Sequence, residues 1–376
     1  MRITHIKTTP LAVRFKEPYH WAGRVDYGAA LVLVEVETDS GLTGVGECTA
    51  GFPAESTVQV LQGVAPLFIG EPVFDIERLF ARARFLGSFN HNPRAANMTL
   101  AGLEMALWDI MGQSAGRPVY QLLGGAFRQE VDYFGFVQGD ETEALAQHAE
   151  QLAEAGYKVI YLKVGRGDEA DMRNVAAVRQ AIGGQRRLRL DANGAWDVHT
   201  AINMINKLAR FDPEWIEQPT PHLSLAALRQ VKESVAVPIA ADQAVFTLFD
   251  VYEVCRQRAA DAIVLSPHEA GGLLALKKAA AIAEAAAIPI CLHGQNVSSL
   301  TDLAQHHIGL TLPNLTDGNQ IMHQLLAEDL VASPDLTPRA GKIGLPERPG
   351  LGVTLDCDAV GRAAELYRKD DAFHHA

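Results

Sequence analysis

The sequence has few cysteines, and they are not placed for a disulfide framework or a cysteine-based metal site. Four cysteines are scattered over 376 residues, with no CxxC pair among them. No uninterrupted apolar run reaches the ~18 residues of a membrane-spanning helix, and the first residues lack the apolar centre of a signal peptide. We therefore expect a soluble, cytoplasmic protein with reduced thiols.

The sequence also lacks an excess of positive charge. Lysine and arginine number 33 against 45 acidic residues, which gives a formal net charge of −12. This balance argues against nucleic acid or an anionic membrane as a general partner. An anionic substrate remains compatible with it, because a bound cation reverses the local field. The length allows one large domain and a smaller one, and we expect a homo-oligomer.

The first third of the chain predicts an α+β domain. Residues 30–38 and 42–47 alternate as two strands around a turn at 39–41, and a polar, aromatic loop precedes them between Tyr19 and Tyr27. Helical periodicity follows and is most regular over residues 95–114. We place this domain at residues 1–125 and expect a C-terminal return of the chain to it at about 345–376.

A different rhythm, strand-like runs separated by amphipathic segments, fills residues 126–344. The predicted strands are 131–137, 159–164, 188–191, 215–217, 238–242, 262–265, 289–292 and 308–312. The predicted helices include 141–155, 169–182, 200–211 and 273–287. Eight such units favour a (β/α)8 barrel. The alternative, a doubly wound open sheet, would want a glycine-rich phosphate loop after its first strand, and residues 134–139 fit that poorly.

Three consecutive predicted strands end in a carboxylate. These are Asp191, Glu217 and Asp242, each about 25 residues, or one strand-plus-helix unit, from the next. In a barrel they would lie at one height and point at one spot. Converging carboxylates are the ligands of a hard divalent cation, Mg²⁺ with Mn²⁺ as an alternative. A single carboxylate at a strand end is more often a helix cap; three in sequence favour the metal site.

Two further strand ends carry groups that can move protons. Lys163 would face the same mouth as Tyr161, two residues before it on the strand. Beside a cation, and partly desolvated, Lys163 would lose its proton more easily and act as a base. His293 ends the seventh strand, across the predicted metal site, and could serve as the second acid or base. The competing interpretations are a solvated lysine head and a structural histidine.

Other polar residues near the predicted mouth have less certain roles. Ser266 and His268 follow the sixth strand and are either substrate or supporting groups, or parts of the loop. Four further histidines look like helix-surface or tail residues: His306, His307, His374 and His375.

Three ordered motifs and the barrel residues above resemble the enolase superfamily, in its mandelate racemase and muconate lactonizing enzyme branch. The motifs are TDSGLTGVGE at 38–47, ALWDI at 106–110 and PVYQLLGG at 118–125. The resemblance covers nearly the whole chain. It implies an α+β capping domain over a modified (β/α)7β barrel, an essential Mg²⁺, and abstraction of the proton α to a carboxylate by a Lys or His base.

The resemblance also implies roles for individual residues. Asp191, Glu217 and Asp242 match the metal ligands, and Lys163 matches the second lysine of a Lys-x-Lys pair. Asn193 matches an asparagine often found two places after the first ligand, and His293 matches the histidine base of the mandelate racemase type. Substrate specificity is implied to come from the loop with His20, Trp21 and Arg24 and from the loop at 48–55.

The chain departs from the family pattern at three positions. Tyr161 replaces the first lysine of the pair, and Gln243 replaces a glutamate after the third ligand. Ser266 stands where the muconate type has a lysine base and the mandelate type an aspartate that orients its histidine. We therefore expect no lysine-to-lysine mechanism, and a His293 without an acid partner.

These residues favour a Mg²⁺-dependent lyase that dehydrates an acid sugar to a 2-keto-3-deoxy acid. The pairing of Lys163 with His293 resembles the dehydratases of this branch, and the polar groups of the 20–24 loop suit hydroxyls or a second carboxylate. A cycloisomerase of the muconate or lactone type, and a racemase or epimerase of a 2-hydroxy acid, remain open. The fourth hypothesis is a barrel that binds a carboxylate ligand without catalysing a reaction.

Overall fold

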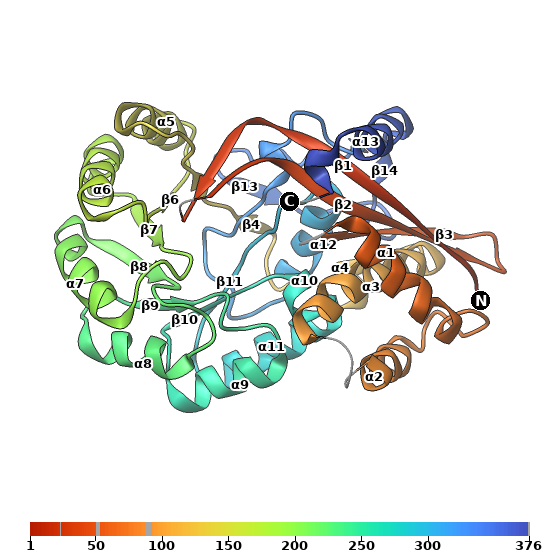
Figure 1. The fold of residues 1–376 in the computed structure, drawn as a ribbon. Coiled ribbons are helices and arrows are strands. Elements are labelled where there is room, and N and C mark those ends of the chain that lie inside the picture. The colour runs from red at the N-terminus through yellow and green to blue at the C-terminus, as the bar shows by residue number, and fades with distance from the viewer. Residues whose placement is uncertain (23, 50–52, 88–91, 375–376) are drawn as a thin grey trace.

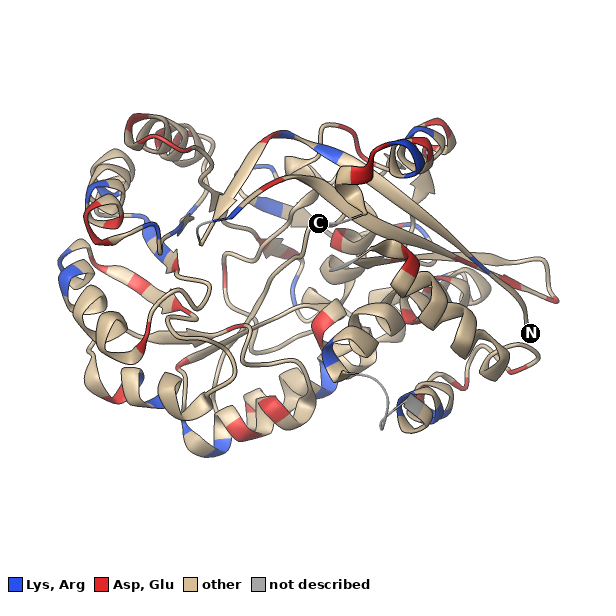
Figure 2. Ribbon diagram, in the orientation of Figure 1, with Lys and Arg blue, Asp and Glu red and all other residues tan. Residues whose placement is uncertain are grey.

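The computed structural model of the chain describes residues 1–22, 24–49, 53–87 and 92–374. Three of the residues in the predicted 48–55 loop (50–52) and His375 lie outside these ranges. No helix in the described ranges is both long enough and apolar enough to cross a membrane. Figure 2 shows acidic and basic residues interspersed along outer helices such as α6 (Asp168–Ile182) and α9 (Leu248–Gln257).

The N-terminal capping domain is a three-stranded antiparallel sheet covered by helices. Its strands, in the order β1-β2-β3, are β1 (Ile3–Trp21), β2 (Arg24–Thr38) and β3 (Thr43–Thr49). Its helices are α1 (Ala54–Val64), α2 (Ile76–Gly87), α3 (Pro93–Ala115) and α4 (Val119–Leu122). Figure 1 shows the long β1–β2 hairpin, in red, reaching across to the strands of the barrel. The predicted strands at 30–38 and 42–47 and the helix at 95–114 are confirmed.

The barrel is a curled parallel sheet of seven strands. In the order of their pairing along the sheet they are β5 (Gly135–Phe136), β6 (Val159–Lys163), β7 (Arg187–Asp191), β8 (Pro213–Glu217), β9 (Ile239–Ala241), β10 (Ala262–Leu265) and β11 (Ile290–Leu292). The helices that follow them are α5 (Thr142–Glu154), α6, α7 (Val198–Leu208), α8 (Leu225–Ser234), α9, α10 (Pro267–Ala270), α11 (Leu273–Ala285) and α12 (Ser299–Gly309). Sequential parallel pairing with helices outside is the barrel pattern, and Figure 1 shows these helices around the outside of the sheet.

The prediction of an eighth strand at residues 308–312 is wrong. Those residues form the end of α12 and the turn after it. Ile308, Leu310 and Leu312 are all buried, and so is every residue of α12, so the apolar residues at the end of this helix form no one-sided helical stripe.

The extended segment 314–320 takes the eighth position instead. Ile290 of β11 donates its amide to the carbonyl of Asn314 (2.9 Å) and accepts from the amide of Thr316 (2.8 Å). On the other side, Phe134 donates to the carbonyl of Asn319 (2.9 Å). These bonds link the two edges of the sheet and exclude an open, doubly wound fold.

The remaining strands form two short antiparallel pairs, and the last helix packs on the capping domain. β4 (Glu130–Asp132) pairs with β13 (Lys342–Gly344), and β12 (Val331–Ser333) pairs with β14 (Thr354–Leu355). Helix α13 (Cys357–Lys369) packs on β1 of the capping domain. There the hydroxyl of Tyr367 accepts the amide of Ala54 at 2.9 Å.

His306 and His307 are buried, which corrects the prediction that they lie on a helix surface. His306 contacts the hydroxyl of Tyr133 through Nδ1 (2.8 Å) and the carbonyl of Gly344 through Nε2 (2.7 Å). Nδ1 of His307 accepts the amide of Tyr120 at 3.2 Å. Burial lowers the pKa of both rings, to about 4 for His306 and about 3 for His307, so both act as neutral hydrogen-bonding groups.

Arg189 closes the base of the barrel from inside. Its side chain is fully buried, its Nε lies 2.6 Å from a carboxylate oxygen of Glu214, and its guanidinium carbon lies 3.6 Å from the centre of the Trp215 ring. The same guanidinium donates to the backbone carbonyls of Asp317 (2.6 Å) and Gly318 in the closing segment. One side chain thus ties the centre of the sheet to its closure.

We predict that Arg189→Met destabilises the protein by about 3–5 kcal/mol, because it leaves buried acceptors unpaired. Arg187→Met is the matched control. Arg187 contacts Glu214 (3.0 Å) and Asp317 (3.2 Å) from a side chain that is 38% exposed, so its loss should cost about 1 kcal/mol or less. Urea unfolding followed by circular dichroism measures both. Equal shifts of the two midpoints would contradict the role given to Arg189.

Glu47 joins the capping domain to the barrel. Its carboxylate, fully buried, accepts the amide of Ser298 (3.0 Å), the hydroxyl of Ser298 and the hydroxyl of Thr301 (3.0 Å) at the start of α12. Burial raises the pKa of Glu47 to about 7 despite these donors. Its folded pKa is therefore above its unfolded one, and its contribution to stability is full below about pH 4.5 and lost by about pH 7.

We predict that Glu47→Gln removes this pH dependence. The stability of the variant relative to the unchanged protein should rise between about pH 4.5 and 7, by at most about 3 kcal/mol. Denaturant unfolding at several pH values in that window measures the difference, with Glu37→Gln, in the neighbouring strand of the same sheet, as the control. A difference that stays constant across the window would show that Glu47 does not titrate there.

Candidate active site

The register of the barrel strands brings the predicted carboxylates together. Lys163 pairs with Asp191 across β6 and β7, and Asp191 pairs with Glu217 across β7 and β8. Asp242 follows the end of β9. Paired positions on parallel strands lie at the same height, so these side chains meet at the carboxyl ends of the strands. Oxygen atoms of Asp191, Glu217 and Asp242 lie within 4.8 Å of one another, and all three residues are buried.

The three carboxylates fit a divalent cation. Burial, and then the negative charges of Asp191 and Asp242, hold the pKa of Glu217 well above its usual range. Burial likewise raises the pKa of Asp242 to about 7, against the lowering effect of His293. Among the described residues, Oδ1 of Asp242 is buried and makes no hydrogen bond, although Nε2 of His293 lies 3.5 Å away. Three close oxygens with an unpaired acceptor form the oxygen-only ligand set that Mg²⁺ prefers.

Lys163 and Tyr161 both point at the carboxylates. Lys163 Nζ lies 2.5 Å from Oδ2 of Asp191, and the Tyr161 hydroxyl lies 2.5 Å from the same oxygen and 2.8 Å from Oε1 of Glu217, so its one proton is shared between the two carboxylates. The ring of Tyr161 stacks on Phe134, with centroids 4.4 Å apart. Tyr161 therefore supports the carboxylates by a neutral donor in place of the cation that the family pattern has there.

The lowered pKa predicted for Lys163 does not arise from the protein's own groups. Burial acts to lower it, but the charges of Asp191, Tyr19 and Glu217 raise the pKa above its ordinary value. The charge of a bound cation acts in the opposite direction. Tyr19, from the capping domain, lies close enough to Lys163 for the two charges to interact and is itself buried, which raises its pKa to about 12.

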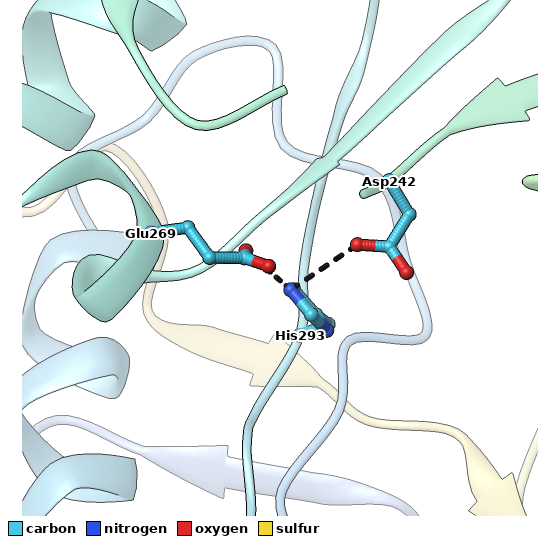
Figure 3. Close-up of side chains that lie close together, drawn as sticks. All are labelled: Asp242, Glu269 and His293. Carbon is cyan, nitrogen blue, oxygen red and sulfur yellow. Dashed lines mark hydrogen bonds and ion pairs between the residues drawn. The ribbon is translucent and has the colours of Figure 1, made fainter. Parts of the chain in front are cut away.

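His293 has an acid partner, so the prediction that it lacks one is wrong. Its Nε2 lies 2.5 Å from Glu269 and 3.5 Å from Asp242 (Figure 3). Burial alone lowers the pKa of a histidine, but the charges of Glu269 and Asp242 outweigh it and raise the pKa of His293 to about 10. Asp242, Glu269 and His293 also lie close enough to hold a metal ion. The direct 2.5 Å contact favours an acid–base pair instead.

Glu269 was missed because it is not at a strand end. It is the third residue of α10, and its carboxylate accepts the amide (3.0 Å) and hydroxyl (3.0 Å) of Ser266. A Ser-x-x-Glu capping box is readable in the sequence as a helix start. Nothing in that pattern points to His293, which lies 24 residues further along the chain.

The buried charges of the mouth balance with a divalent cation present. The three carboxylates and Glu269 face two cationic side chains, Lys163 and His293. The surplus of two negative charges is large for a buried site and calls for a compensating ion. This is the second observation in favour of Mg²⁺ at the three carboxylates.

A cavity of about 540 Å³ lies over this cluster, between the capping domain and the barrel. Of the residues predicted to contact substrate, it is lined by Trp21, Arg24, Asn193 and Gln243. Sequence reasoning missed others that line it, among them Tyr19, Arg94, Met98, His222 and Phe246. Several come from turns and helix starts, where no periodic signal marks them. The guanidinium of Arg94 stacks on Phe246, 3.8 Å from its ring centre.

The other predicted contacts do not line this cavity. Nδ1 of His20 faces Asp140, 3.5 Å from its carboxylate. Ser266 caps α10, and Nε2 of His268 contacts the backbone carbonyl of Glu47 at 2.7 Å. Both are buried. These contacts support the interpretation that Ser266 and His268 are structural parts of the loop after β10.

Comparison with known proteins covers nearly the whole chain. Residues 3–124 match the family described as mandelate racemase / muconate lactonizing enzyme, N-terminal domain, and residues 144–360 match the family described as enolase C-terminal domain-like. The chain belongs to the enolase superfamily, in its mandelate racemase and muconate lactonizing enzyme branch. It is therefore related to enzymes with Mg²⁺-dependent ene-diolate chemistry.

Several curated relatives of the chain are isomerases. Muconate cycloisomerase 1 of Rhodococcus opacus is 34% identical, over 96% of this chain and 98% of that protein. L-Ala-D/L-Glu epimerase of Bacillus subtilis is 31% identical, over 94% and 97%. Among solved structures, the dipeptide epimerase of Enterococcus faecalis in complex with Mg and the dipeptide L-Leu-L-Tyr has a TM-score of 0.87 at 29% identity, over 94% of this chain and 100% of that one.

We predict that Mg²⁺ stabilises the protein through the three carboxylates. At about 100 times its dissociation constant it should add about 2.7 kcal/mol. Glu217→Gln should lose this increment, because it removes one ligand oxygen's charge, whereas Glu233→Gln on the exposed end of α8 should keep it. Thermal unfolding and titration calorimetry with MgCl₂ measure the effect. An equal increment in Glu217→Gln and the unchanged protein would place the ion elsewhere.

Proposed function

We propose that the protein is a Mg²⁺-dependent racemase or epimerase that inverts the carbon α to a carboxylate. The observation that carries this proposal is the placement of two proton-transfer groups on either side of the carboxylates. Lys163 ends β6, before the first carboxylate strand, and His293 follows β11, beyond the last. Each contacts a carboxylate of its own, Asp191 at 2.5 Å and Glu269 at 2.5 Å.

Asp191, Glu217 and Asp242 would hold the ion. When bound, Mg²⁺ supplies positive charge for the carboxylate and for the ene-diolate that proton loss creates. Lys163 or His293 takes the α-proton from one face, and the other gives a proton to the opposite face. Glu269 orients His293 and stabilises its charged form. Asn193 and Gln243, which line the cavity beside the ligands, are proposed substrate contacts.

The substrate is proposed to be a small acid with an amide or a second polar group. Arg24 and Arg94 bring positive charge to the cavity, and Trp21 and Phe246 bring aromatic surface. Trp21 is fixed by its Nε1, which donates to Asp26 at 2.8 Å. These groups suit an N-acylated amino acid or dipeptide as well as a hydroxy acid, and the relatives described as dipeptide epimerases favour the former.

Dehydration of an acid sugar, which the sequence favours, is not supported by the relatives, which are cycloisomerases and epimerases. A cycloisomerase is the second candidate, because muconate cycloisomerase 1 is 34% identical to the chain. Ser266 follows β10 where the muconate type has its lysine base, and this difference argues against the mechanism of the muconate type. In a lactone-type reaction, Lys163 or His293 would protonate or deprotonate the same α-carbon without inverting it.

We predict Mg²⁺-dependent exchange of the α-hydrogen in D₂O for both enantiomers of a matching acid. A library of dipeptides, N-acyl amino acids, hydroxy acids and lactones, read by NMR, identifies it. Lys163→Ala should lose exchange from one enantiomer and His293→Asn from the other, each by about 10²–10⁴-fold. The exposed Lys207→Ala and His199→Asn are the matched controls.

Each alternative has a distinct readout in the same assay. A 2-keto product would identify a dehydratase, and ring opening or closure would identify a cycloisomerase. Absence of exchange across the library, with ligand binding retained, would identify a barrel without turnover. Full activity in either variant would remove that residue from the proposed proton path.

A further inference from the structure

The element that carries Glu269 is too short to hold its own position. Helix α10 has four residues, and a single helical turn is unstable in isolation. Its ends are fixed locally by the Ser266 cap and by Gly271, whose φ of +85° suits glycine. These contacts define the turn but not where it lies relative to His293.

The capping domain fixes that location: Arg84 of α2 donates to the carbonyl of Gly271 (2.7 Å), His268 meets the carbonyl of Glu47 (2.7 Å), and α3 supplies Asn97. Nδ2 of Asn97 donates to the backbone carbonyl of Glu269 (2.8 Å) and to that of Phe246 (2.9 Å). Asn97 is only 5% exposed, so both bonds are shielded from water. A Cβ added at Gly271 would lie 2.6 Å from Oδ1 of Asn97, which shows how closely the two elements pack.

The backbone carbonyls of Phe246 and Glu269 lie in the two segments that also carry the acidic side chains near His293, Asp242 and Glu269. Phe246 lies four residues after Asp242, on the loop that leads into α9, and Glu269 lies on α10. His293 Nε2 is 2.5 Å from Glu269 and 3.5 Å from Asp242. One amide group thus sets the spacing between a proposed metal ligand and the proposed partner of the base.

We propose that Asn97 is a positioning residue that holds Glu269 against His293 and keeps the imidazole from turning to Asp242. Its catalytic consequence rests on the proposed function, because it requires His293 to act on one face of the substrate. Without Asn97, two buried carbonyls lose a donor, α10 and the 242–247 loop separate, and the hydrogen bond of His293 passes to Asp242. Asn97 therefore bears on the geometry of His293 and not on that of Lys163, whose neighbour from the capping domain is Tyr19.

A first test needs no substrate. Asn97→Ala and the control Gln113→Ala are prepared as full-length, Mg²⁺-loaded proteins with ¹⁵N-labelled histidine. Gln113 is the matched control because it lies on the same helix and its Nε2 also makes two hydrogen bonds, to Thr43 (2.9 Å) and Asp109 (2.9 Å), within the capping domain. The ring signals of His293, assigned with His293→Asn, should shift in Asn97→Ala and stay in Gln113→Ala.

A second test uses the acid found by exchange in D₂O. Exchange from the His293 face should fall about 10–100-fold in Asn97→Ala, with exchange from the Lys163 face unchanged. Equal loss from both faces, or no loss, would overturn the proposal, as would unshifted His293 signals. If Asn97→Ala does not fold, Asn97→Asp keeps the shape and removes both donors, and the same comparison decides. Absence of any exchange in the unchanged protein would count against the proposed function alone.

Discussion

The mouth of the barrel is organised by buried negative charge. Strand register forces Asp191, Glu217 and Asp242 to within 4.8 Å of one another, away from water. Charges of one sign in such a place are costly unless a cation or strong donors offset them. Tyr161 meets two of these carboxylates as a neutral donor, where a second lysine would have added charge. The two buried cations that contact these carboxylates, Lys163 and His293, thus leave a surplus of negative charge that matches a divalent ion.

The capping domain is part of the same electrostatic arrangement and does more than cover the cavity. It reaches the barrel through buried polar contacts with defined partners. Glu47 binds the start of α12, Asn97 binds the backbone of α10, and the carboxylate of Glu104 accepts the amides of Leu273 (2.6 Å) and Leu274 at the start of α11. Apolar packing tolerates small rotations, whereas buried polar contacts lose their partners when elements shift. The orientation of the cap is therefore specified.

Sequence alone predicts most of what depends on one strand and its neighbour. The spacing of Asp191, Glu217 and Asp242 is fixed by the strand–helix unit, so their convergence follows from counting. The segment that closes the barrel cannot be predicted in this way. Asn314, Thr316 and Asn319 belong to no apolar repeat, and their backbone pairing depends on strands that are distant in the sequence. The role of Glu269 cannot be predicted from the sequence for a related reason. Its contact with His293 is tertiary, and a capping box reports only the local turn that it helps to form.

The two proposed proton-transfer groups are consequently positioned in different ways. Lys163 shares a strand and a register with the carboxylates, so whatever holds the sheet together also places the lysine. His293 depends on Glu269, which depends on α10, which is held from the capping domain. A change at Asn97 can then alter the His293 half of the proposed proton path while Lys163 and the carboxylates keep their positions. A change of reaction on a common set of carboxylates would arise most readily in that half, where Ser266, one of this chain's three departures from the family pattern, caps the helix that carries Glu269.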